Sequence, residues 1–386
     1  MLTKNIKFKN FLIKSKKSKI KKILNLLFLE KNEILNSLST KYEYSFSKKI
    51  IKKYKKNYNL RIIGMGGSIL GTEAIFSFLK HKIKKNVFFA NNLVNKYLKF
   101  NKKIFLNLIV SKSGNTLETI TNANILINKK DDNIFITENR DSYLRSMANQ
   151  LKAEIIDHNN FIGGRYSVLS EVGMLPIELA GLNSKKFKQL NFLIKNKNFM
   201  NALVQNVSNT LSLIKKKKYA SVILNYDEKS ENLFKWYQQL IAESLGKKSK
   251  GILPTISSMP KDNHSLMQMY LDGPKKNFYT FFYVFNSNSQ KINNDKILSS
   301  FSYLKNKNIE KILYSQKLAT ERIFHKKKLP FRSFEVNKRD EKTLGELFCF
   351  FILETILLGK SLGVNPYDQP SVELIKRETK KILKKY

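Results

Sequence analysis

The sequence predicts an α/β fold of two tandem, doubly wound parallel-sheet domains, with helical N- and C-terminal segments. First, short apolar runs alternate with amphipathic stretches over residues 60–157, which is the pattern of parallel strands joined by helices. Second, the same alternation resumes over residues 219–362 after a helical stretch. Third, two early strands end in glycine- and serine-rich turns, which are typical of the ligand-binding edge of such a sheet.

The elements of the first unit follow from this periodicity. Its predicted strands are 60–64, 87–90, 104–110, 133–137 and 153–157, and its predicted helices are 72–79, 117–127 and 141–151. A helical stretch at 169–182 and a long polar helical segment to residue 218 lead into the second unit. There the predicted strands are 219–225, 252–256, 278–285 and 331–336, and the predicted helices are 232–245, 266–271 and 344–362.

The composition is that of a globular chain. Of the 386 residues, 42% are hydrophobic and 12% are aromatic, which is enough to build a core and excludes a wholly disordered chain. The single cysteine, Cys349, excludes a disulfide framework, and the four histidines are too widely spaced to suggest a structural zinc site. The most apolar run, 347–358, is shorter than the roughly 20 residues that span a bilayer. Residues 1–22 lack the apolar core of a secretory signal, so we expect no membrane partner and a cytoplasmic location.

The charge is strongly basic, at +41, and a nucleic-acid-binding protein is therefore one alternative. Only eight of the 71 basic residues are arginine, however, the side chain that recognition sites favour for bidentate contacts. We therefore expect no nucleic-acid partner, although the positive field should attract anionic small molecules. That alternative predicts DNA binding whose affinity falls steeply as the salt concentration rises.

Two strand ends carry the side chains and glycines of a phosphate site. Residues 64–68 read Gly-Met-Gly-Gly-Ser at the junction of a strand and a helix, where free backbone N–H groups and the helix dipole favour an anion. Residues 111–116 read Ser-Lys-Ser-Gly-Asn-Thr after another strand, and their hydroxyls can surround one phosphate. Each turn alone is equally well explained as an ordinary capped turn, but two on one sheet are much more specific. Neither has the spacing of a dinucleotide fingerprint or a P-loop, so a sugar monophosphate fits best.

Six motifs in this order resemble the glucose-6-phosphate isomerase (phosphoglucose isomerase) family, whose members contain two sugar-isomerase (SIS) domains. Besides residues 64–68 and 111–119 they are Gly-Gly-Arg-Tyr-Ser at 163–167, Glu-Ser-Leu-Gly-Lys at 243–247, His-Ser at 264–265 and Asn-Pro-Tyr-Asp-Gln-Pro at 365–370. The resemblance covers about residues 60–376. It departs from the family pattern at 371–376, where serine and isoleucine replace the usual glycines, and at Asn263, where glutamine is usual.

The resemblance implies a catalytic role for four residues. Glu243 matches the base that moves a proton between C2 and C1, Arg165 matches the cation beside the enediolate oxygens, and His264 and Lys376 match the residues that open the sugar ring. The substrate-binding residues implied are Gly67, Ser68, Ser111, Lys112, Ser113, Thr116, Gln239 and Gln369. The resemblance implies no metal and no organic cofactor. It also implies a homodimer, because the matching histidine of relatives reaches across from the partner subunit.

The physical chemistry of these side chains can be weighed without the resemblance. Glu243 lies on an apolar helical stretch, which suits a half-buried base, yet a surface glutamate explains that position better on its own. Arg165 follows two glycines, and a fixed guanidinium stabilises an oxyanion. For His264, a proton shuttle and a solvated histidine near a helix start are equally good interpretations. Lys376 has the least independent support, because lysines are frequent throughout the chain.

The expected domains are a helical N-terminal arm (1–50), a first SIS-type domain with the phosphate cradle (51–165), a second with Glu243 (166–340) and C-terminal helices that finish the site (341–386). The expected activity is the reversible isomerisation of glucose 6-phosphate and fructose 6-phosphate, in glycolysis and gluconeogenesis. One alternative is another sugar-phosphate isomerase, for example one that also accepts mannose 6-phosphate. The second is a non-catalytic sugar-phosphate sensor, which would need the cradle but not Glu243, Arg165 and His264.

Overall fold

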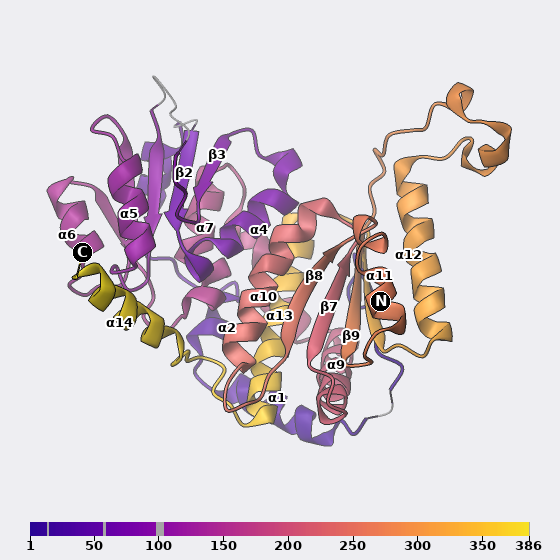
Figure 1. Cartoon of the computed structure of the whole chain (residues 1–386). Coiled ribbons are helices and arrows are strands. Elements are labelled where there is room, and N and C mark those ends of the chain that lie inside the picture. Colours follow the sequence, from indigo (N-terminus) through magenta and orange to yellow (C-terminus); the bar gives the residue numbers. More distant parts are fainter. Residues whose placement is uncertain (14, 57–58, 98–103, 386) are drawn as a thin grey trace.

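Two five-stranded sheets occupy separate halves of the molecule, with helices between and around them (Figure 1). The computed structural model describes residues 1–13, 15–56, 59–97 and 104–385. Within these ranges every strand pairing is parallel except the one made by the first strand. The predicted α/β fold with two parallel-dominated sheets is confirmed.

The first sheet has the strand order β3-β2-β4-β5-β6. Its strands are β2 (Asn59–Gly64), β3 (Asn86–Ala90), β4 (Leu106–Val110), β5 (Asp132–Thr137) and β6 (Glu154–Asp157). All five residues of β4 are buried, as expected for a central strand with helices on both faces. Strand β3 lies on one side of β2 and strand β4 lies on the other, so the direction in which strands are added to the sheet reverses at β2. The carboxyl ends of β2 and β4 therefore form the switch point where open α/β sheets bind ligands.

The second sheet has the strand order β1-β10-β9-β7-β8. Its parallel strands are β7 (Ala220–Asn225), β8 (Leu253–Ser258), β9 (Asn277–Val284) and β10 (Phe331–Val336). The fifth, β1 (Ile6–Lys9), pairs antiparallel with β10 and lies inside the segment expected to be helical. Its alternation of Ile, Lys, Phe and Lys has the period of a strand, so Ile6 is fully buried and Phe8 packs on Phe334 with ring centroids 4.5 Å apart.

Helices fill the space between the sheets and cover their outer faces. The helices packed between the two halves are α4 (Leu70–Phe78), α7 (Glu171–Leu179), α10 (Glu231–Leu245) and α13 (Glu341–Leu362). The others are α1 (Ser18–Leu29), α2 (Glu33–Ser37), α3 (Lys48–Tyr54), α5 (Leu117–Leu126), α6 (Tyr143–Gln150), α8 (Leu190–Leu193), α9 (Lys197–Lys215), α11 (Met267–Asp272), α12 (Ile309–Lys326) and α14 (Val372–Leu383). No helix in the described ranges is both long enough and apolar enough to cross a membrane.

Helix α10 is the element that joins the two halves. It packs against α4 of the first unit on one side and against α13 on the other. The side chain of Trp236 on α10 meets Phe348 of α13 edge to face, with centroids 4.8 Å apart. Every residue from 343 to 359 of α13 is buried, so α10 rests on a rigid base. This packing carries the C-terminal half of α10 to the carboxyl edge of the first sheet.

Candidate active site

The two predicted phosphate turns lie side by side at the switch point of the first sheet. Gly64, at the end of β2, is paired with Val110, at the end of β4. In the second turn the Oγ of Ser111 and the Oγ1 of Thr116 are 2.9 Å apart. Gly114 has a φ of +64°, and a Cβ there would come within 2.1 Å of Ser142 Oγ. The turn therefore requires glycine at this position.

The first turn is held between two segments, η3 and α10, that lie on either side of it. A Cβ on Gly67 would lie 2.2 Å from the backbone of Gly164, so only glycine allows the 3-10 turn η1 (Gly66–Ser68) to touch η3 (Gly164–Leu169). On the other side, a Cβ on Gly66 would lie 2.8 Å from Gln239 Nε2 on α10. The phosphate turn, the segment that carries Arg165 and helix α10 therefore meet at one point.

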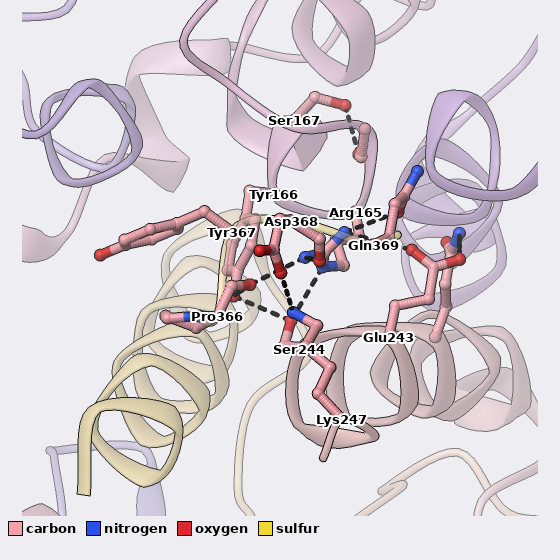
Figure 2. A network of polar contacts seen from close by, with 12 residues as sticks. Arg165, Tyr166, Ser167, Glu243, Ser244, Lys247, Pro366, Tyr367, Asp368 and Gln369 are labelled. Carbon is pink, nitrogen blue, oxygen red and sulfur yellow. Dashed lines mark hydrogen bonds and ion pairs between the residues drawn. The ribbon is translucent and has the colours of Figure 1, made fainter. Parts of the chain in front are cut away.

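Arg165 is the centre of a polar network, which Figure 2 shows. Its side chain is 2% exposed, and each of its five N–H groups has an acceptor. The acceptors are Ser244 Oγ for Nε (2.8 Å), Gln369 Oε1 (2.7 Å) and Glu243 Oε2 (3.3 Å) for Nη1, and the backbone oxygens of Pro366 (2.8 Å) and Asp368 (2.9 Å) for Nη2. A buried guanidinium needs such pairing, because an unpaired charge is costly to desolvate.

Glu243 projects from α10 toward this guanidinium. Its Oε1 accepts a hydrogen bond from Gln239 Nε2 at 2.8 Å, and its side chain is 25% exposed. Gln239 Oε1 is itself buried and has no hydrogen-bond partner among the described residues. The result is a carboxylate that is held in place, partly desolvated and still accessible, next to a fixed cation. A carboxylate of this kind can act as a general base on an acidic C–H group.

Most of the predicted substrate-binding residues come together here. Ser68, Ser111, Ser113 and Thr116 lie in the two turns, Gln239 lies on α10, and Gln369 reaches Arg165 from the loop that follows α13. Lys112 lies in the second turn, but its ammonium group binds other protein groups. It donates to the backbone oxygen of Asn160 at 2.8 Å and lies 3.3 Å from a carboxylate oxygen of Glu138.

The two predicted ring-opening residues lie outside this network. His264 follows the 3-10 turn η6 (Lys261–Asn263), is exposed, and makes no side-chain hydrogen bond within the described ranges. Lys376 lies on α14, a helix with no buried residue, and pairs with Glu373 at 2.7 Å. Figure 1 shows α14 extending away from the end of α13. In the described part of this single chain, neither residue contacts Arg165 or Glu243.

Besides Pro366 and Asp368, which contribute backbone oxygens to the network, two residues contribute side chains that were not predicted to belong to the site. Ser244 follows Glu243 on α10, and Tyr166 follows Arg165, and both are fully buried. Both stood inside motifs that the sequence singled out, but their side chains carry no charge that would have marked them. A lesser contact is the pair formed by Lys247 and Asp368 at 2.7 Å, which ties α10 to the loop after α13.

Comparison with known proteins gives a consistent result. A family model described as "Phosphoglucose isomerase" matches residues 45–386. A glucose-6-phosphate isomerase of Methanocaldococcus jannaschii is 33% identical over 348 residues, which cover 84% of this chain and 83% of the relative.

Solved structures agree on the fold. A hypothetical protein of Thermus thermophilus superposes with a TM-score of 0.81 at 22% identity, covering 95% of this chain and 94% of that one. A glucose-6-phosphate isomerase of Chlamydia trachomatis superposes with a TM-score of 0.66 at 18% identity, covering 91% of this chain and 73% of that one. At these identities the similarity concerns the fold alone.

Proposed function

Because the chain belongs to the phosphoglucose isomerase family, we propose that it interconverts D-glucose 6-phosphate and D-fructose 6-phosphate through a cis-enediolate, with Glu243 as the base. The observation that carries the proposal is the junction of the first phosphate turn with α10 and η3. There Gly66 touches Gln239 and Gly67 touches Gly164, so Glu243 and Arg165 stand next to the cradle. One hexose phosphate can thus reach both the cradle and the base.

The phosphate group is held by the first unit. The hydroxyls of Ser68, Ser111, Ser113 and Thr116 and the N–H groups of the two turns bind its oxygens. The net charge of +41 draws the dianion toward the protein. We also propose that the chain divides functionally as the motifs suggest, with the cradle in residues 51–165 and the base in 166–340.

The proton transfer needs one carboxylate and one cation. Glu243 removes the proton from C2 of the open-chain aldose, the C2–H electron pair forms the C1–C2 double bond, and the C1=O π pair moves onto O1 to give the enediolate. The same carboxyl group then delivers a proton to C1 while the proton of the C2 hydroxyl passes to O1 and the C2=O bond forms, which yields the ketose. Arg165 stabilises the negative charge on the enediolate oxygens through Nη1. The two N–H groups of Nη1 bond Glu243 and Gln369 in the free chain, so the enediolate oxygen takes the place of one of these acceptors. We also assign Gln239 to substrate binding, as its position beside the cradle suggests. Its Oε1 is buried and has no hydrogen-bond partner among the described residues.

Ring opening is assigned to His264 and Lys376. Because the His264 side chain is exposed and makes no hydrogen bond within the described ranges, we propose a homodimer in which His264 of one subunit serves the site of the other. Lys376 would reach the sugar once α14 folds over the site. The proposed course uses no metal and no organic cofactor. A cytoplasmic location is proposed as well, since a charged sugar phosphate does not cross a bilayer unaided.

The proposal is tested by a coupled assay on purified protein with fructose 6-phosphate as substrate. We expect turnover that a chelator does not reduce. Mannose 6-phosphate in the same assay separates a narrow isomerase from a bifunctional one. Binding of sugar phosphate without turnover would contradict the proposed catalytic activity and favour the alternative of a non-catalytic sugar-phosphate sensor.

A further inference from the structure

Ser244 is a fully buried hydroxyl on α10, directly after the proposed base Glu243. Its Oγ accepts a hydrogen bond from Arg165 Nε at 2.8 Å and lies 2.9 Å from the hydroxyl of Tyr166. The hydroxyl of Tyr166 is in turn 3.0 Å from the backbone oxygen of Pro366. These groups lie on the far side of the guanidinium from Glu243 (Figure 2).

The proton of each hydroxyl in this group can be assigned by elimination. A carbonyl oxygen only accepts, so Tyr166 donates its single proton to Pro366. Ser244 must then donate to the oxygen of Tyr166 while it accepts from Arg165. Burial raises the pKa of Tyr166, so the phenol keeps its proton at neutral pH.

These bonds close a ring around one edge of the guanidinium. The ring runs from Arg165 Nε through Ser244 and Tyr166 to the oxygen of Pro366, which also accepts from Arg165 Nη2 at 2.8 Å. Each bond in such a chain polarises the next, and the ring leaves the guanidinium plane no freedom to rotate. The remaining edge of the guanidinium, at Nη1, faces Glu243 and Gln369, the side chains that lie where the substrate is proposed to react.

We propose that Ser244 is a positioning residue for the isomerisation, and that it acts with Tyr166 to aim Arg165 Nη1 at the oxygen that becomes negatively charged in the enediolate. The inference rests on the proposed function. It assigns Ser244 an effect on the transition state and none on phosphate binding. Preorganised donors of this kind matter most when charge develops, so their loss lowers kcat more than it raises KM.

The test compares Ser244→Ala and Tyr166→Phe with the wild type. We expect Ser244→Ala to lower kcat by about 10- to 100-fold with KM for fructose 6-phosphate changed less than about threefold. Tyr166→Phe keeps the serine and should lower kcat by a smaller factor. The affinity for a sugar-phosphate hydroxamate, whose planar charged oxygens resemble the enediolate, should fall in parallel with kcat, while the affinity for inorganic phosphate stays unchanged.

A matched control is Ser221→Ala. Ser221 lies on β7, is 2% exposed, and its hydroxyl has no hydrogen-bond partner among the described residues, so its loss should leave kcat unchanged. If the wild type turns over and Ser244→Ala keeps its kcat within twofold, the positioning role is wrong while the proposed function stands. If Ser244→Ala weakens phosphate and hydroxamate equally, the effect is general disruption and the inference is also overturned. A wild type without turnover refutes the proposed function itself.

Discussion

The two groups of catalytic residues proposed here differ in how much of their environment one folded chain supplies. Arg165 and Glu243 are hydrogen-bonded into a network that joins η3, α10 and the loop after α13. His264 and Lys376 lie on exposed elements and make no contact with that network within the described ranges. We call Arg165 and Glu243 the interior pair, and we call His264 and Lys376 the surface pair.

This difference follows from what each pair has to do. A cation and a base that stabilise a short-lived anion act best when they are fixed and partly desolvated, because reorganisation then costs nothing during the reaction. Groups that exchange protons with a sugar-ring oxygen can approach only after the substrate is bound. We infer that the network is ready in the free chain, whereas the ring-opening part is finished by a second subunit and by α14.

The largest expected effect comes from breaking the interior pair with Glu243→Gln. The amide keeps the size of the side chain and can still accept from Arg165, but it cannot take up the proton from C2. We expect kcat to fall by about 10³-fold with little change in KM, since general base catalysis typically contributes 10²–10⁴-fold. Steady-state kinetics on fructose 6-phosphate measure this.

The control for that variant is Glu231→Gln on the same helix. Glu231 forms an exposed pair with Lys235 at 3.0 Å, and the loss of such a pair should leave kcat unchanged. Near-normal turnover of Glu243→Gln would show that another group is the base.

The surface pair is tested by mixing two defective subunits. A dimer of one Glu243→Gln subunit and one His264→Ala subunit, purified through two different tags, contains one intact site if His264 acts across the interface. Its activity should be about half that of the wild type, although both parent dimers are nearly inactive. A mixed dimer as inactive as its parents would place His264 in the site of its own subunit.

A smaller effect, on the stability of the folded chain, is expected from Lys188, which contacts the segment that carries Arg165. Lys188 is 2% exposed, donates to the backbone oxygens of Ser37 and Leu169, and lies 4.7 Å above the ring of Tyr42. Leu169 ends η3, the segment that carries Arg165. Burial lowers the pKa of Lys188 to about 7, because an ammonium group is poorly solvated there.

The sign of the resulting pH dependence can be worked out. The unfolded chain keeps its proton on this lysine to about pH 10.5, whereas the folded chain releases it near pH 7. The unfolded state therefore binds more protons between these values, and the free energy of unfolding should rise with pH across this window. Urea denaturation at several pH values measures the slope, and Lys188→Met should flatten it. An equal slope in the variant would assign the dependence to other groups.

The sequence was sufficient for most of the fold because nearly every strand is a short apolar run between turns. The strands predicted at 60–64 and 331–336, for example, match β2 (Asn59–Gly64) and β10 (Phe331–Val336) to within one residue. Strand β1 was missed because four residues in a lysine-rich segment give too short an alternation to outweigh the helical pattern around them. Helix α12 was not predicted either, since only three of its residues, Lys317, Glu321 and Phe324, are buried.

The site was predictable where residue type and motif order coincide. The two turns are local features, and Arg165 and Glu243 were each singled out by the motif that contains them. The structure brings the turns and both side chains together. The ring of Ser244, Tyr166 and Pro366 could not be predicted, because it closes only when η3, α10 and the loop after α13 meet in space. The partners of Lys112 likewise depend on folding, since its turn lies beside the segment that contains Asn160.

The most direct test of Glu243 as a single base between C2 and C1 is the fate of deuterium at C2 of glucose 6-phosphate. When the reaction is run in ordinary water, mass spectrometry of the fructose 6-phosphate formed should find part of the deuterium at C1 and the rest lost to solvent. This mixture is expected because one carboxyl group takes the deuteron from C2 and either transfers it to C1 or first exchanges it with solvent protons. Complete retention at C1 would instead indicate a direct hydride shift and contradict the proposed role of Glu243.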